Sequence, residues 1–314
     1  MREIVYKKHG DVTVLEERDG PEPRKRRGRL RVEVYAIGLN PLDCRLRRGE
    51  MRALSAVTMP RRTGSDFAGV VLDVGQGVEG YAPGDRVFGM LSQFVDGASA
   101  DLVSVRVEQV AHVPETLDLE TAAGVPLASL TAYQALTHLV DVGPSHHVLV
   151  NGASGGVGSF ATQLCKIKGA RLTTVTSHRN TAWMSELGAD NTLDYNQTDF
   201  TKGPQRYDLV FDCYGNRSFA SVRSVLESEG TFISVIPDPR NLASTLPNIF
   251  RKAKSKVVAV RPRGHELKIL GGLIDAGQLE PVIDRVYERS AVHDAYRFLE
   301  TKRARGKVVL RMRG

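Results

Sequence analysis

Polar and apolar positions alternate in short runs along the first third of the chain. Segment 30–36 (Leu-Arg-Val-Glu-Val-Tyr-Ala) alternates with a period of two, which is typical of a half-buried strand. Segments 67–75 and 86–89 are further short apolar runs, bounded by glycines and by the Pro-Gly turn at 83–84. Glycines inside such strands often mark bends at barrel corners. This part of the chain predicts a small, curved all-β domain.

After Pro114 the pattern changes to strands that alternate with helices. A helix is predicted over 156–168, where apolar residues share one stripe, and it ends at Gly169. The other predicted helices are 117–140 (broken at Gly124 and Pro126), 183–187, 219–226, 265–276 and 291–302, and the predicted strands are 146–151, 171–176, 207–212, 231–236, 256–260, 285–286 and 307–310. Alternation of strands and helices predicts the α/β class with a doubly wound parallel sheet.

The most specific feature is the stretch 148–158, Val-Leu-Val-Asn-Gly-Ala-Ser-Gly-Gly-Val-Gly. It predicts a strand, a tight turn and the start of a helix. In the dinucleotide fingerprint G-x-G-x-x-G, Ala153 takes the first place, Gly155 the second and Gly158 the third. Gly155 would let the backbone approach a pyrophosphate, and Gly158 would let helix and strand pack closely. The pattern predicts a dinucleotide site, and the alternative is a flexible glycine loop.

The residues after the next predicted strand bear on which dinucleotide binds. An NAD site usually has Asp or Glu there, about 20 residues beyond the glycine turn, to bond the ribose 2′-hydroxyl. Here the strand is followed by Ser177-His178-Arg179-Asn180, without a carboxylate. Arg179 and Ser177 offer a guanidinium fork and a hydroxyl to a 2′-phosphate. The sequence favours NADPH, and the alternative is that Arg179 is a solvated surface residue.

Composition excludes several classes of protein. The 314 residues, with 41% hydrophobic and 25% charged, suit a soluble globular chain of two domains at roughly 100–200 residues each. No apolar run reaches the ~18–20 residues of a membrane helix, and residues 1–8 lack the apolar core of a secretory signal. We therefore expect a cytoplasmic protein. Cys44, Cys165 and Cys213 stand far apart, so neither a disulfide framework nor a Cys-x-x-Cys zinc site is predicted.

The charge balance is basic. Lys and Arg number 43 against 36 Asp and Glu, for a net charge of +7, which permits an anionic ligand or weak affinity for nucleic acid. The densest cluster is Arg24-Lys25-Arg26-Arg27, beside Pro21, Pro23 and Gly28. We interpret this cluster as a solvated loop.

Several short motifs follow one another at a characteristic spacing. They are Gly-Leu-Asn-Pro-Leu-Asp (38–43), 64–71, 83–89, 125–133, the glycine turn, 187–190 with Asp194-Tyr195, and Gly-Lys-Val-Val-Leu (306–310). On these motifs, which extend over nearly the whole chain, the sequence resembles the zinc-independent quinone oxidoreductases (ζ-crystallin-like) among the medium-chain dehydrogenases/reductases. The resemblance implies a GroES-like β-barrel domain, residues 1–120 completed by 265–314, a Rossmann NADPH-binding domain, residues 121–264, and a homodimer.

The resemblance also bears on zinc. The zinc alcohol dehydrogenases of this superfamily have a Cys ligand near the position of Asn40 and a His ligand at the position of Ser65. The amide of Asn40 and the hydroxyl of Ser65 are poor ligands for zinc, which prefers thiolate, imidazole or carboxylate. No cysteine follows Gly89 where the family's structural zinc lobe would lie. We therefore expect no metal site. The adjacent His146 and His147 would point to opposite faces of a strand and are interpreted as structural.

Without a metal, the expected reaction is hydride transfer to a quinone or an α,β-unsaturated ketone or aldehyde. The cofactor carries the hydride, while the protein orients the reactants. The resemblance makes Asn40 the candidate to hold the substrate oxygen or the ribose; the alternative is a turn asparagine before Pro41. Asp43 would position Asn40 or a proton-relay water, or is structural. The family often has a tyrosine near the position of Arg45, so no proton donor is assigned in this chain. Arg45 either contacts the substrate or is solvated beside Arg47 and Arg48.

The resemblance further assigns residues to the cofactor. Thr131 would lie near its phosphates, and Tyr195 would lie near the adenosine phosphate unless it belongs to the core. The other expected contacts are Ser154, Gly155, Gly156, Val157, Ser177, Arg179, Tyr214, Val235, Ile236 and Pro237. Two functions follow. One is an NADPH-dependent quinone or enone reductase; the alternative is an NADPH-binding sensor or nucleic-acid-binding protein with little catalysis, which the basic charge suggests.

Overall fold

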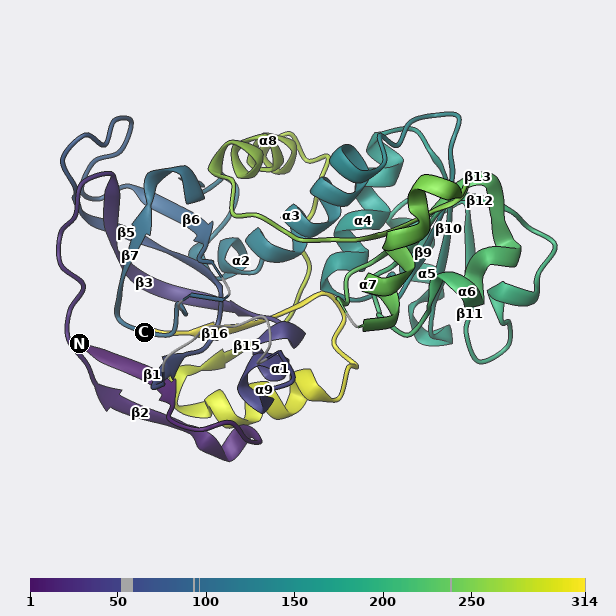
Figure 1. The fold of residues 1–314 in the computed structure, drawn as a ribbon. Coiled ribbons are helices and arrows are strands. Elements are labelled where there is room, and N and C mark those ends of the chain that lie inside the picture. Colours follow the sequence, from purple (N-terminus) through teal and green to yellow (C-terminus); the bar gives the residue numbers. More distant parts are fainter. Residues whose placement is uncertain (52–58, 93, 96, 238, 314) are drawn as a thin grey trace. The chain divides into compact units, whose positions relative to one another are not determined.

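The computed structural model describes residues 1–313, apart from 52–58, 93, 96 and 238 (Figure 1). The chain divides into two compact units. Unit 1 comprises Met1–Leu130 and Arg261–Gly314, and unit 2 comprises Thr131–Val260. The divisions lie near, but not at, the expected boundaries of 120 and 264. Helix α2 (Leu119–Ala123) explains part of the difference, because it packs on strands of unit 1 and continues that unit beyond residue 120.

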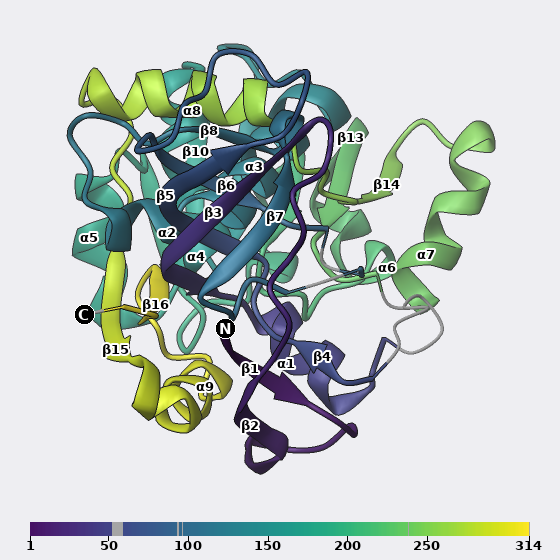
Figure 2. The same cartoon turned by 90° about the vertical axis from the view of Figure 1, so that its left-hand side faces the viewer.

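Unit 1 consists mainly of antiparallel strands (Figure 2). Its strands are β1 (Arg2–Tyr6), β2 (Leu15–Asp19), β3 (Arg29–Leu39), β4 (Arg61–Arg62), β5 (Asp66–Val74), β6 (Arg86–Met90), β7 (Leu102–Arg106), β8 (Val110–His112), β15 (Ile283–Glu288) and β16 (Lys307–Arg311). Its helices are α1 (Pro41–Arg48), α2, α8 (Gly264–Asp275) and α9 (Val292–Glu300), while α3 (Pro126–Gln134) crosses the division between the units.

The long strand β3 organises unit 1. Leu30, Val32 and Val34 alternate along it as buried positions, as the period of two predicts. β3 pairs antiparallel with β5, β7 and β16, so segments from the beginning and the end of the chain share one sheet. In the register of β3 and β16, Leu39 lies opposite Val308. This pairing brings Lys307 to the end of β3, where the motif Asn40–Asp43 begins.

Unit 2 is an α/β layer structure around one parallel sheet. Its strands are β9 (His147–Asn151), β10 (Arg171–Thr176), β11 (Asn191–Asp194), β12 (Tyr207–Asp212), β13 (Leu226–Ser234) and β14 (Lys254–Val257), and its helices are α4 (Gly156–Ile167), α5 (Thr181–Glu186), α6 (Phe219–Val222) and α7 (Pro239–Thr245). The strand order is β11-β10-β9-β12-β13-β14, so the chain runs outward first in one direction from β9 and then in the other. This confirms the predicted doubly wound sheet, in which the loops at the carboxyl ends of the strands meet at one edge.

Most predicted elements of unit 2 occur where the pattern places them. β10 and β12 have the predicted bounds, and α4 ends one residue before the predicted end. The predicted helix 219–226 is too long: α6 ends at Val222, a 3-10 turn follows, and Leu226 begins β13. Leu226 lies opposite Tyr207 in the sheet, so strand pairing outweighs its apolar spacing with Phe219 and Val222.

Candidate functional site

Asn40 occupies the junction between β3 and α1. It has extended backbone angles, and Pro41 begins the helix, a position where the missing N–H of proline costs no hydrogen bond. The backbone N–H of Asn40 donates to the Asp43 carboxylate at 2.8 Å, and the N–H of Asp43 donates to the Asn40 carbonyl at 2.9 Å. Asn40 is therefore the extended residue that caps the helix, rather than part of a turn. Asp43 positions this junction.

The side chain of Asn40 is held by a charged pair. Its Nδ2 donates to Asp66 Oδ2 at 3.0 Å and to the Gly38 carbonyl at 3.3 Å, and its Oδ1 accepts from Lys307 Nζ at 2.5 Å. Both amide protons are thus engaged, while Oδ1 keeps a second lone pair. Of the two roles expected for Asn40, this arrangement favours accepting a bond from a ribose hydroxyl over donating one to a substrate oxygen.

Lys307 and Asp66 form a buried ion pair, which was not among the residues selected from the sequence. Lys307 Nζ lies 3.2 Å from Asp66 Oδ2, and the side chains are 4% and 0% exposed. Asp66 Oδ1 also accepts the N–H of Leu127 at 2.8 Å. The sequence contains a signal for this pair, because each charge begins an apolar strand: Lys307 precedes Val-Val-Leu and Asp66 precedes Phe-Ala-Gly-Val-Val. A charge in such a strand needs a partner when it is buried.

Burial changes the acidity of the two carboxyl groups beside Asn40. Burial raises the pKa of Asp43 to about 7, against the hydrogen bond from Asn40 that lowers it. Burial also raises the pKa of Asp66, against the opposing charge of Lys307. A cavity of about 10 Å³, bounded by Asp43, Tyr6, Arg61, Thr63 and Ser65 among others, adjoins Asp43. Such a volume is close to the minimum for one water molecule.

The arginines of α1 differ in environment. Arg45 pairs with Glu50, Nε to Oε2, at 3.0 Å, and no described contact of Arg45 tests a role toward substrate. Arg47, by contrast, is fully buried. Its guanidinium donates to Glu300 and lies 5.2 Å from the ring centre of Tyr296 on α9. A carboxylate and an aromatic face therefore replace the water around this charge.

The glycine turn of unit 2 connects β9 to α4. Gly152 has a φ of 75°, in the left-handed region that favours glycine. A Cβ on Gly158 would lie 2.3 Å from the carbonyl oxygen of Gly152, so this glycine permits the close approach of helix and turn. A Cβ on Gly155 would meet only that same oxygen, at 3.5 Å. Gly155 therefore leaves open space in front of the turn, as a pyrophosphate site requires.

The helix N-terminus at this turn offers hydrogen-bond donors. Gly155 is the N-cap of α4, and Gly156 and Val157 are its first helical residues, whose N–H groups have no acceptor within the helix. The Ser154 hydroxyl accepts a hydrogen bond from the Thr176 hydroxyl at 2.9 Å, which joins the turn to the end of β10. This group of residues fits the phosphates of a dinucleotide. Thr131, on α3, is buried, and its expected place near the phosphates stays a prediction.

The residues expected at a 2′-phosphate follow two neighbouring strands. Thr176 of β10 lies opposite Asp194 of β11, and the Tyr195 N–H donates to the Thr176 carbonyl at 3.1 Å. The segment with Ser177 and Arg179 therefore starts beside Tyr195, at one edge of the sheet. Tyr195 is 58% exposed, so it does not belong to the core. Arg179 is also exposed.

The loops after β12 and β13 lie at the same edge of the sheet. A Cβ on Gly152 would contact Tyr214, and one on Gly215 would contact Ile236, which places the segments 214–215 and 235–237 beside the glycine turn. The buried carboxylate of Asp212 organises this edge: it accepts from Asn151 Nδ2 at 2.8 Å and from the N–H of Gly215 at 2.9 Å. Asp212 was not singled out from the sequence, although it ends a predicted strand. Burial raises its pKa.

The adjacent histidines make contacts that agree with structural roles for both. His146 accepts from the N–H of Gly143, and the His147 ring bonds the hydroxyl of Thr173. In the part of the chain that the structure describes, no three His, Cys, Asp or Glu side chains are grouped to hold a metal ion. None of the described helices is long and apolar enough to cross a bilayer.

Two family models match segments of the chain, the second of them across the division between the units after Val260. Residues 26–115 match the family model described as alcohol dehydrogenase GroES-like domain, and residues 187–310 match the one described as zinc-binding dehydrogenase. A solved structure of a quinone oxidoreductase from Coxiella burnetii superposes with a TM-score of 0.91 at 29% identity, over 100% of this chain and 99% of that one. The GroES-like and Rossmann folds implied by the resemblance are confirmed.

Relatives known by sequence extend over the same length. The chloroplastic quinone-oxidoreductase QR1 of Triphysaria versicolor is 30% identical, over 99% of this chain and 98% of that protein. The chloroplastic NADPH-dependent alkenal/one oxidoreductase of Arabidopsis thaliana is 32% identical, over 99% of this chain and 79% of that protein. On these matches and on the fold, the chain belongs to the quinone oxidoreductase family of the medium-chain dehydrogenases/reductases.

Proposed function

We propose that the protein is an NADPH-dependent reductase of quinones or of α,β-unsaturated ketones and aldehydes that works without a metal ion. The residues at the carboxyl end of β10 support NADPH as the cofactor. Ser177 and the exposed Arg179 and Tyr195 lie there, where an NAD site would have an acid. A guanidinium and hydroxyls suit a phosphate, whereas NAD sites use a carboxylate for the free 2′-hydroxyl. Relatives named as quinone and as alkenal/one oxidoreductases support the substrate class.

Residues of each unit have their own role in the proposed reaction. The N–H groups at the start of α4 and the open space at Gly155 would hold the pyrophosphate. When bound, NADPH supplies a hydride. In unit 1, Lys307 and Asp66 orient the Asn40 amide so that its Oδ1 can accept one more hydrogen bond. Reduction of an enone leaves an enolate that needs a proton, and Asp43, with a pKa near 7 beside a small cavity, can store one.

The residues around Asn40 do not fit zinc. The positions of the family's Cys and His ligands hold an amide and a hydroxyl, which are poor ligands for zinc. Asn40 Oδ1 already accepts a hydrogen bond from the Lys307 ammonium at 2.5 Å. The site instead contains a fixed organic cation. The proposed reaction therefore uses no metal ion.

The test compares two arginines on the same strand–loop segment. Arg179→Ala should weaken NADPH binding by about 1.5–3 kcal/mol, the value of a charged hydrogen bond, and leave NADH binding unchanged. Arg171→Ala, at the opposite end of β10, should change neither affinity. Fluorescence titration measures both, and a panel of small quinones and enones then tests turnover. Equal binding of NADPH and NADH by parent and Arg179→Ala would overturn the phosphate assignment, and tight binding without turnover would overturn the reductase.

A further inference from the structure

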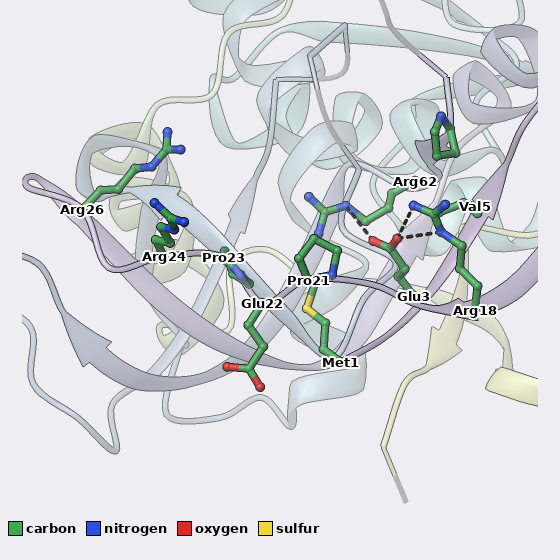
Figure 3. A pocket seen from close by; sticks show the side chains of 11 residues that line it. Met1, Glu3, Val5, Arg18, Pro21, Glu22, Pro23, Arg24, Arg26 and Arg62 are labelled. Carbon is green, nitrogen blue, oxygen red and sulfur yellow. Dashed lines mark hydrogen bonds and ion pairs between the residues drawn. The ribbon is translucent and has the colours of Figure 1, made fainter.

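A basic pocket lies within unit 1, on the side of β1 and β2 (Figure 3). Its volume is about 440 Å³, and it extends between the first strands, the segment 21–26 and β4. The lining residues are Met1, Glu3, Val5, Arg18, Pro21, Glu22, Pro23, Arg24, Arg26, Pro60 and Arg62. Four of these are arginines and two are glutamates, so positive charge predominates. Neither the family motifs of the sequence nor the proposed reaction uses this pocket.

One end of the pocket is a built ion cluster. Glu3 is 6% exposed, and its Oε1 accepts from the Arg18 guanidinium at 2.7 and 2.9 Å. Its other oxygen, Oε2, lies 3.9 Å from Nε of Arg62. Figure 3 shows Arg18 and Arg62 on either side of this carboxylate. Two guanidinium groups therefore lie against one buried carboxylate at this end.

The other end of the pocket has arginines without an acidic partner. In the part of the chain that the structure describes, no carboxylate lies within ion-pair distance of Arg24 or Arg26, and both are exposed. Glu22 Oε2 lies 3.7 Å from Arg31 Nη1, and the Glu22 carboxylate extends away from Arg24 and Arg26 in Figure 3. These two guanidinium groups can therefore bind an external anion without first breaking an ion pair.

The segment that carries these arginines is anchored. The Pro23 carbonyl accepts from Arg31 at 3.4 Å, the Arg26 carbonyl accepts from the N–H of Arg29 at 3.3 Å, and the N–H of Gly28 donates to Gln76 at 3.0 Å. Pro21 and Pro23 further restrict the backbone. Within the run 24–27, only Arg24 and Arg26 line the pocket, while Lys25 and Arg27 do not. The expected loop is thus exposed, as predicted, but two of its four charges share one concave face.

We infer that this pocket binds a small anion that carries phosphate groups, such as a phosphorylated metabolite. Guanidinium forks match the geometry of phosphate oxygens, and the volume lies in the ~300–1,000 Å³ range of small-molecule sites. Glu3 and Glu22 within the lining disfavour a continuous nucleic-acid backbone, which would bring charge along the whole surface. The site lies within unit 1 and is independent of the dinucleotide turn in unit 2.

The alternation of residues 24–27 provides a matched test. Pyrophosphate is titrated into the full chain by calorimetry, comparing Arg24→Gln/Arg26→Gln with Lys25→Gln/Arg27→Gln. Each double variant removes two exposed positive charges, and neither alters the glycine turn, so any pyrophosphate bound there is the same in both. We expect the first pair to weaken the affinity at the pocket by ~tenfold or more and the second pair by less than ~twofold. Equal thermal midpoints would show that both variants fold.

Four results would overturn the inference. Equal weakening by both pairs would mean that pyrophosphate responds only to the overall charge. Unchanged binding in both would place it at another site, such as the turn of α4, and absence of binding in the parent would exclude the pocket. Single-stranded RNA that binds the parent and is lost equally from both variants would indicate an extended basic surface instead.

Discussion

Asp43 is a buried carboxyl whose pKa of about 7 makes its charge depend on pH near neutrality. In the unfolded chain the pKa returns to its usual value near 4. Between these values the folded state holds a proton that the unfolded state has released. Stability therefore falls as pH rises from about 4 to about 7 and is constant with respect to this group above that range.

Asp43→Asn removes this dependence, because asparagine is neutral and its Oδ1 can still accept the N–H of Asn40. Relative to the parent, the free energy of unfolding of the variant should increase between about pH 4 and pH 7 and then level off. Urea unfolding at several pH values measures the difference. Curves that stay parallel over that range would contradict the raised pKa.

Lys307→Met should be strongly destabilising, because it leaves Asp66 buried without its counter-ion. Removing one partner of a buried ion pair typically costs about 3–5 kcal/mol. Lys307→Met/Asp66→Asn should recover part of the loss, since no unpaired charge remains and the new amide oxygen can still accept the N–H of Leu127. Urea unfolding of the parent, both single variants and the double variant supplies the comparison; additive effects of the two changes would show that the pair is not coupled.

The residues around Asn40 illustrate how far the sequence leads. Asn40 and Asp43 lie within one short motif, and a single stretch of sequence was enough to select them. Their supporting pair was not selected, because Lys307 and Asp66 are 241 residues apart and meet only through the strand order β16-β3-β5. The pattern predicts both strands but does not predict which strands are neighbours.

At the scale of elements, the turn between β9 and α4 contains two glycines with different functions. A methyl group on Gly158 would collide with the backbone at Gly152 and Ala153, at 2.3 and 2.6 Å. A methyl group on Gly155 would fit within the turn, and its φ of −82° is open to any residue. One glycine serves packing and the other serves the space for a ligand.

Gly158→Ala should therefore destabilise the protein by about 1–3 kcal/mol, the usual cost of overpacking. Gly155→Ala should leave stability nearly unchanged and weaken NADPH binding by ~tenfold or more, because its methyl group occupies the space expected for the pyrophosphate. Thermal unfolding and fluorescence titration separate the two effects. A Gly155→Ala variant that binds NADPH like the parent would remove the turn from the site.

Strands and helices with a clear apolar period were predicted well, and α1 was not. Its segment 41–48 begins after an Asn-Pro pair and contains three arginines, so its composition resembles a solvated turn. The structure makes it a helix whose buried face includes Cys44, Leu46 and the fully buried Arg47. A buried arginine is visible only when its partners are known, and Glu300 and Tyr296 come from the far end of the sequence.

At the scale of the whole molecule, we expect the homodimer that the family resemblance implies to use the free edge of the parallel sheet. β14 is an edge strand, and Leu246 and Ile249 in the 3-10 turn before it are 78% and 81% exposed. Exposed apolar side chains beside a strand edge that pairs with no other described strand favour pairing with a second copy.

Leu246→Asp/Ile249→Asp should convert the dimer to a monomer, because the two new carboxylates of each copy would be desolvated at the interface. Ile269→Asp, which changes an exposed apolar residue of α8 in unit 1, is the control and should leave the dimer intact. Sedimentation equilibrium measures the molecular mass. A parent that is monomeric, or a double variant that stays dimeric, would exclude this edge.

The pairing of β16 with β3 has a consequence for how the protein is made. Because a ribosome synthesises the chain from its amino end, all strands of unit 2 emerge before Lys307 does. The parallel sheet can therefore fold early, whereas the sheet that contains β3 is complete only after β16 has been synthesised. Until that moment Asp66 has no ammonium beside it, and the nascent chain has an exposed strand edge. A polypeptide released before residue 307 would therefore contain the strands of the parallel sheet but an incomplete unit 1.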